Sequence, residues 1–135
     1  MKAIDWADIR YFGPDDNFGD PGKMDSELIY ALDTFRNYVG KPVIVHCGWE
    51  ERTYGYHPKG MAVDCHVIDM ALFDQYMTAS RFMSFRGIGV YPWWRCPGLH
   101  LDSRPLQKYG RRALWGSTAP KQYVKLTKQF LYRTL

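Results

Sequence analysis

The stretch His57-Pro-Lys-Gly60-Met-Ala-Val-Asp64-Cys-His66 decides the fold around it, because it joins a turn to a strand. Gly60 has no side chain to obstruct a sharp turn after His57. The mostly apolar residues that follow predict a strand over residues 62–67. This strand brings the carboxylate of Asp64 back toward the imidazole of His57.

A second strand with ionisable side chains is predicted over residues 98–102, where Leu and ionisable residues alternate. Side chains at positions i and i+2 share a strand face, so His66 lies beside Asp64 and Asp102 lies beside His100. Ionisable groups on otherwise apolar strands are costly unless they are paired or bound to a metal. Catalytic zinc takes three protein ligands and keeps one position for water. We therefore expect zinc to be held by His57, Asp64 and His100.

The rest of the chain predicts an α+β fold in a single domain over residues 1–135, with an irregular arm over residues 1–23. Apolar residues at helical spacing followed by Gly40 predict a helix over residues 25–39. The other expected elements are strands over 43–47 and 87–91, helices over 70–85 and 120–133, a loop over 49–56 and an irregular basic segment over 103–119.

Composition narrows the classes of function. The 135 residues are 46% hydrophobic and 24% charged, as in globular proteins, and the aromatic fraction of 16% suggests a groove lined by aromatic side chains. A net charge of +4 favours anionic partners, but no nucleic-acid-binding motif is present. We expect neither nucleic acid nor membrane as a partner. Three cysteines without Cys-x-x-Cys spacing argue against disulfides and a thiolate zinc knuckle, and favour free thiols.

Three motifs resemble the M15 group of zinc D,D-/L,D-peptidases, most closely the murein endopeptidase branch catalogued as DUF882. They are His57-x-x-Gly-x-Ala-x-Asp64, Gly87-x-Gly-x-Tyr91-Pro and His100-x-Asp102, within a likeness that covers about residues 24–116. The resemblance implies a Hedgehog/DD-peptidase-like fold, with a small antiparallel sheet flanked by helices. It also implies zinc on His57, Asp64 and His100, and hydrolysis of peptide bonds in peptidoglycan stems or cross-links.

The sequence departs from the M15 pattern at the residue that would accept a proton from water. Some relatives carry an acidic residue three positions before the last zinc histidine, where this chain has Pro97. We expect His66 or Asp102 to act as the base instead, with Glu50 or Glu51 in reserve. The alternative for Asp102 is orientation of a ligand imidazole. The alternative for His66 is a structural hydrogen bond, and His46 is expected to face away from the site.

The expected substrate-binding residues lie in loops beside the motifs. Relatives often have Ser-Gly-Tyr-Arg where this chain reads Cys47-Gly-Trp-Glu50, so Arg52 is expected to replace that arginine. The expected groove residues are Arg52, Trp49, Tyr91 and Trp93.

The function expected from the sequence is that of a zinc metallopeptidase, a carboxypeptidase or endopeptidase, that acts on peptidoglycan peptides as a monomer. The alternative is a module that keeps zinc and binds cell-wall peptides without cutting them. The start of the chain, Met1–Asp8, is too acidic and short for a signal peptide. We expect synthesis in the cytoplasm and endolysin-like delivery to the wall, by a phage or another signal-independent route.

Overall fold

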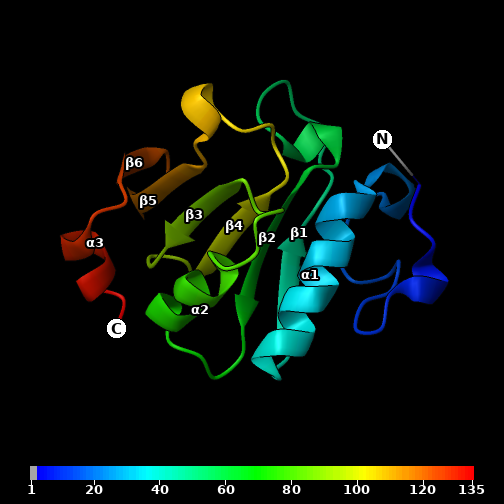
Figure 1. The fold of residues 1–135 in the computed structure, drawn as a ribbon, viewed down its shortest axis with the longest axis horizontal. Coiled ribbons are helices and arrows are strands. Elements are labelled where there is room, and N and C mark those ends of the chain that lie inside the picture. The colour runs from blue at the N-terminus through cyan, green and yellow to red at the C-terminus, as the bar shows by residue number, and fades with distance from the viewer. Residues whose placement is uncertain (1–2) are drawn as a thin grey trace.

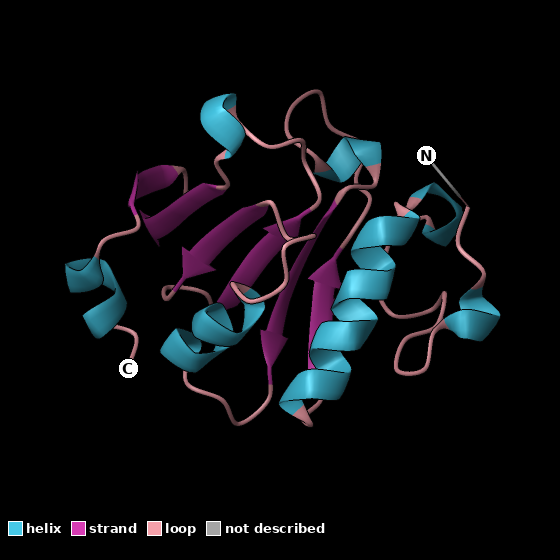
Figure 2. Ribbon diagram, in the orientation of Figure 1, coloured by secondary structure: helices cyan, strands magenta, loops and turns pink. Residues whose placement is uncertain are grey.

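A computed structural model describes residues 3–135 as three helices and one six-stranded sheet (Figures 1 and 2). The strands follow the order β1-β2-β4-β3-β5-β6. Neighbouring strands are antiparallel, except that β3 and β5 run parallel. The strands are β1 (Val43–Cys47), β2 (Ala62–Val67), β3 (Gly87–Tyr91), β4 (Gly98–Asp102), β5 (Ala113–Ala119) and β6 (Gln122–Lys125).

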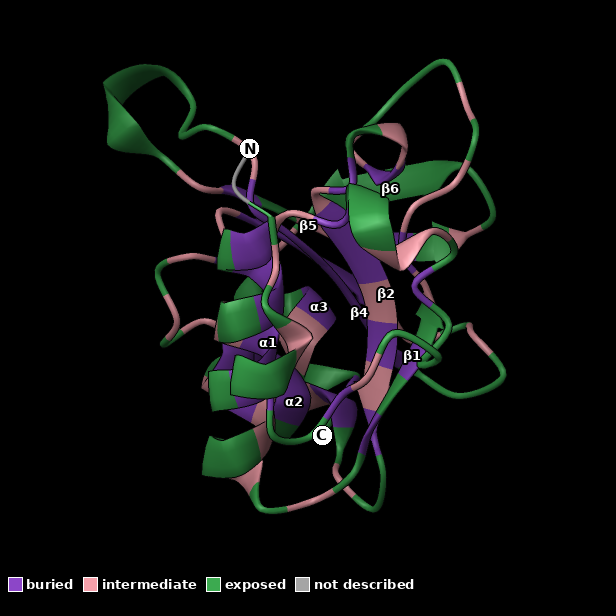
Figure 3. Cartoon of the chain, turned by 90° about the vertical axis from the view of Figure 1, so that its right-hand side faces the viewer, coloured by how far each residue is buried: buried purple, intermediate pink, exposed green. Residues whose placement is uncertain are grey.

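Two helices cover one face of the sheet, and Figure 3 shows this layer from the side. These are α1 (Ser26–Val39) and α2 (Leu72–Ala79), while α3 (Lys128–Tyr132) places Phe130 against Gly116 of β5. Every second residue of the central strands points toward α1 and α2 and is buried. The buried core includes Leu28, Leu32, Phe35, Val63, Cys65, Ile88, Leu99 and Leu101. The alternate residues of β2 and β4 are therefore left to line the opposite face.

The N-terminal arm is pinned to α1 by a buried carboxylate. Asp33 accepts hydrogen bonds from the backbone N–H groups of Arg10 and Tyr11, at 3.1 and 2.9 Å. Phe18 is fully buried and its carbonyl accepts from the N–H of Trp49. The arm thus supports the loop that carries the candidate site.

The predicted α+β class is confirmed, as are the bounds of the first four strands. The sheet is mixed, however, and the predicted helix over 120–133 is wrong. Lys121 has a positive φ of 60° in a turn that joins β5 to β6, so a helix cannot run through it. The only helix in this region within residues 3–135 is α3, which Thr127 caps by accepting from the N–H of Phe130.

The predicted helix over 70–85 ends early, at Ala79. The guanidinium of Arg112 donates hydrogen bonds to the carbonyl groups of Ser80, Phe82 and Phe85. These carbonyl groups are satisfied by a side chain more than twenty residues away in sequence, so they do not require helical partners. No helix within residues 3–135 combines the length and apolar character needed to cross a membrane.

Candidate metal centre and cleft

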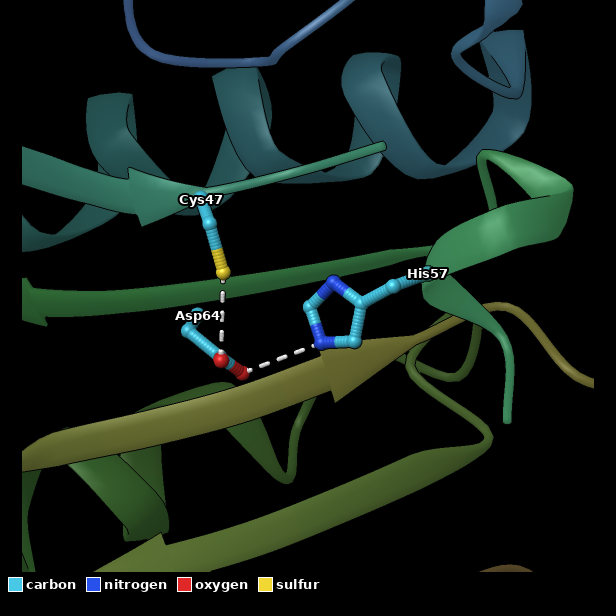
Figure 4. Close-up of side chains that lie close together, drawn as sticks. All are labelled: Cys47, His57 and Asp64. Atoms are coloured by element: carbon cyan, nitrogen blue, oxygen red, sulfur yellow. Dashed lines mark hydrogen bonds and ion pairs between the residues drawn. The ribbon is translucent and has the colours of Figure 1, made fainter. Parts of the chain in front are cut away.

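The face of the sheet opposite α1 and α2 carries a group of possible metal ligands. Cys47 at the end of β1, His57 in the short 3₁₀ turn His57–Lys59 and Asp64 in β2 each direct one ligand atom to a common region (Figure 4). These three atoms lie within 4.8 Å of one another. The group is largely buried and could bind a metal ion.

His57 is fixed by its backbone surroundings. Its Nδ1 lies 2.7 Å from the carbonyl oxygen of Gly48, which leaves Nε2 to face Asp64 Oδ1 at 3.5 Å. Gly60, with φ of 69°, closes the turn behind His57, and its carbonyl accepts from the N–H of Asp25 at 2.7 Å. A side chain at Gly60 would collide with the backbone of Lys23, so only glycine fits there.

His100 of β4 contacts the same carboxylate, Asp64, from the neighbouring strand. Its Nδ1 lies 3.1 Å from Asp64 Oδ1, and its Nε2 lies 2.7 Å from Asp102 Oδ2. Burial alone lowers the pKa of His100, but the bonds to Asp102 and Asp64 outweigh it and raise the pKa to about 9. Burial raises the pKa of Asp64, but the hydrogen bonds from His100 and His57 have the opposite effect and hold the pKa of this carboxyl well below its usual range.

The residues present fit a zinc ion. The imidazoles of His57 and His100 both face the Asp64 carboxylate. The other ring nitrogen of His57 is hydrogen-bonded to a backbone carbonyl, and that of His100 to the carboxylate of Asp102. This is how proteins orient histidine ligands of zinc. The structure thus brings together the three residues that the sequence predicts as ligands.

Asp102 is completely buried and serves to orient His100. Besides its bond to His100, it accepts from Arg104 Nε at 2.8 Å and from Arg104 Nη2 at 2.7 Å. A side chain at Gly87 would lie about 2.2 Å from the Asp102 carboxylate, so the glycine makes room for it. Burial raises the pKa of Asp102, but the bonds from His100 and Arg104 lower it to about 2. This geometry matches the orienting role rather than contact with substrate.

His66 lies on the same sheet face as Asp64 but is turned away from the metal group. Its Nδ1 is 2.7 Å from His46 Nε2, and the ring of His46 lies beside that of Trp94. His46 does not face away as expected: it follows the core-facing Val45, so strand alternation puts it on the same face as Ile44 and His66. His46 and His66 therefore hydrogen-bond to each other, which agrees with the structural alternative for His66.

An open cleft of about 530 Å³ lies over His57, Asp64 and His100. Three of the four residues that the sequence predicts for substrate binding line this cleft: Arg52, Tyr91 and Trp93. Trp49 is not among the lining residues: its Nε1 donates to the carbonyl of Pro58, and its ring packs against the core and Lys23. The aromatic walls include Tyr54, Tyr56, Tyr91, Trp93, Trp94 and Trp115.

Sequence reasoning missed two residues at this site. Arg104 lines the cleft with its guanidinium 4.6 Å from the ring centre of Tyr56 and 5.1 Å from that of Trp115, as well as holding Asp102. The sequence signal for Arg104 is its position two residues after Asp102, but Arg104 falls in the segment 103–119 that the sequence predicts as irregular. Cys47 carries no ligand signal in the sequence, because the three cysteines lack Cys-x-x-Cys spacing and it ends an apolar strand.

Comparisons with known proteins give no match for this chain among protein-family models, curated proteins or solved structures.

Proposed function

We propose that this protein is a zinc-dependent peptidase that hydrolyses peptide bonds in bacterial peptidoglycan. The observation that carries the proposal is the convergence of His57, Asp64 and His100 at the base of an open cleft. The resemblance of the three motifs to zinc D,D-/L,D-peptidases supports the same activity. A site that reaches a cleft can meet a substrate, whereas a purely structural zinc site is closed by four protein ligands.

His57, Asp64 and His100 would hold the zinc ion in this proposal. Bound zinc supplies a Lewis acid for the scissile carbonyl and lowers the pKa of a water molecule toward about 7. Asp102 keeps the ring of His100 in one orientation and one tautomer, and Arg104 in turn holds Asp102.

Glu50 is the side chain that we assign as proton acceptor. It is partly exposed, its carboxylate accepts a hydrogen bond from Arg52 Nε at 2.8 Å, and its backbone N–H donates to the carbonyl oxygen of His57 at 3.4 Å. Burial raises the pKa of Glu50, but bonds from Arg52 and Cys47 lower it, so the carboxylate is ionised at neutral pH and can accept a proton. Glu50 is paired with Arg52, which lines the cleft, whereas Asp102 is completely buried and His66 pairs with His46 outside the cleft lining.

The charge of the cleft suits a peptide that carries free carboxylates. Arg52, Arg104 and Lys121 line it, and among the described residues Asp64 is the one acidic side chain that does so. Peptidoglycan stem peptides carry several free carboxylates, which arginine side chains bind through paired hydrogen bonds. The aromatic walls supply flat surfaces for the intervening aliphatic groups.

Digestion of purified peptidoglycan tests the proposal directly. The zinc-loaded protein should release new amino groups and soluble muropeptides, which mass spectrometry would assign to a particular bond. The His57→Ala variant should bind no zinc and release nothing. An intact sacculus after incubation with a verified zinc-loaded protein would refute the peptidase assignment.

A second candidate is a zinc-containing module that binds wall peptides without cutting them. Pro97 at the position of the usual acid favours it, because a proline side chain cannot accept a proton. The Glu50→Gln variant separates the two candidates. A peptidase should lose its activity about 10²–10⁴-fold on this change, while a binding module should sediment with peptidoglycan equally well in both forms and release no product.

A further inference from the structure

We propose that Cys47 is a fourth protein ligand of the metal, completing a set of one thiolate, two imidazoles and one carboxylate. The inference rests on the metal centre proposed above. It concerns a residue that neither the sequence motifs nor the proposed hydrolysis require.

The backbone of β1 is built to aim Cys47 at the centre. Residues Val43 and Val45 point into the core, and a regular strand would send Cys47 the same way. A bulge between Val45 and Cys47 shifts the register, so that Cys47 pairs with Asp64 instead. The thiol therefore lies on the ligand face, 3.3 Å from Asp64 Oδ2, while Cys65 of the neighbouring strand remains in the core.

Asp64 has the other three side chains close to its carboxylate. Zinc bonds of about 2.0–2.3 Å place the ligand atoms of a tetrahedron about 3.3–3.8 Å apart. Cys47 Sγ lies 3.3 Å from Asp64 Oδ2, whereas His57 Nε2 and His100 Nδ1 lie 3.5 and 3.1 Å from Asp64 Oδ1, all near this range. Cys47 and His57 also lie within 4.8 Å of each other, so the metal can reach both (Figure 4).

Gly48, the residue after Cys47, positions a second candidate ligand, His57. Gly48, which follows Cys47 in the chain, is the residue whose carbonyl oxygen holds His57 Nδ1. One short segment thus places both a ligand and the group that orients a second ligand. Coordination requires the thiolate, so the S–H proton is released to solvent as the metal binds.

Four protein ligands have a consequence for the proposed reaction. A closed tetrahedral set leaves no position for water. Hydrolysis at such a centre would require a water molecule to replace Cys47 on the metal, and the released thiolate would take up a proton from solvent.

Cobalt substitution tests the proposal with a spectroscopic readout. Cobalt(II) takes the place of zinc at such sites, and a thiolate ligand adds an intense charge-transfer absorption in the near ultraviolet. We would titrate cobalt(II) into the metal-free protein and into the Cys47→Ser and Cys96→Ser variants, with circular dichroism to confirm folding. Cys96 is an exposed thiol in the loop between β3 and β4 and provides the matched control.

The expected result is one near-ultraviolet band per bound cobalt in the wild type, retained in Cys96→Ser and lost in Cys47→Ser. Visible cobalt absorption without this band in the wild type would overturn the ligand role of Cys47 and leave the three-ligand centre standing. A wild-type protein that binds no cobalt or zinc would overturn the metal centre itself, and the Cys47 proposal with it.

Discussion

Raising the pH from 6 to 9 should destabilise the metal-free protein by about 2–3 kcal/mol through the titration of His100. The folded protein raises the pKa of this imidazole from its ordinary value of 6.5 to about 9, because Asp102 and Asp64 both bond to it. At about 1.36 kcal/mol per pKa unit, the difference corresponds to about 3 kcal/mol of stability. A raised folded pKa means that this stability is fully present below pH 6.5 and is lost as the pH rises toward 9.

Other groups contribute little in this window. Asp64 and Asp102 are ionised above pH 6 in the unfolded chain as well, so their lowered pKa values affect stability only in acid. Burial lowers the pKa values of His46 and His66, so at pH 6 these two residues offset part of the stability that protonated His100 provides, and the comparison is cleanest from pH 6.5 upward. His100 therefore dominates between pH 6.5 and 9, and the buried thiols of Cys47 and Cys65, whose pKa values burial raises, add a smaller loss near pH 9 that the His100→Asn variant keeps.

Urea denaturation of the chelator-treated protein at pH 6, 7.5 and 9 would measure the effect. The His100→Asn variant is the control, since its side chain keeps a hydrogen-bonding group but cannot take up a proton. Zinc should remove the pH dependence in the wild type, because it binds the neutral imidazole and competes with the proton. Equal unfolding free energies at pH 6 and 9 in the metal-free wild type, or the same fall in His100→Asn, would refute the reasoning.

Three further predictions follow from the geometry. Asp102→Asn should weaken zinc binding about 10–100-fold in a competition assay with a chelating dye, since His100 loses the carboxylate that orients it; unchanged affinity would contradict this role. Gly60→Ala should abolish zinc binding or folding, because the new methyl group would meet the carbonyl oxygen of Lys23, whereas the same change at the open position Gly55 should not. Phe35→Ala should lower the unfolding free energy by about 3–5 kcal/mol in urea, because this ring is fully buried in the core, and a loss below about 1 kcal/mol would show that the core is packed differently.

The sequence by itself determined the elements whose signals are local. Alternation of apolar and ionisable residues placed β2 and β4 and put Asp64 and His100 on one face. Gly60 after His57 marked the turn that brings His57 to the same region. These features depend on strand periodicity and on the backbone freedom of glycine, both of which can be read from neighbouring residues.

Only the tertiary structure decided the features that depend on distant partners. Arg112 binds the carbonyl groups that follow α2, and Arg104 binds the carboxylate of Asp102. The hairpin of β5 and β6 depends on backbone pairing at the edge of the sheet. The bulge in β1 left no mark that sequence periodicity could detect, because Val43–Cys47 has the composition of a regular strand. Pairing with β2 places this bulge opposite Asp64, so Cys47 leaves the core face and its thiol contacts the Asp64 carboxylate.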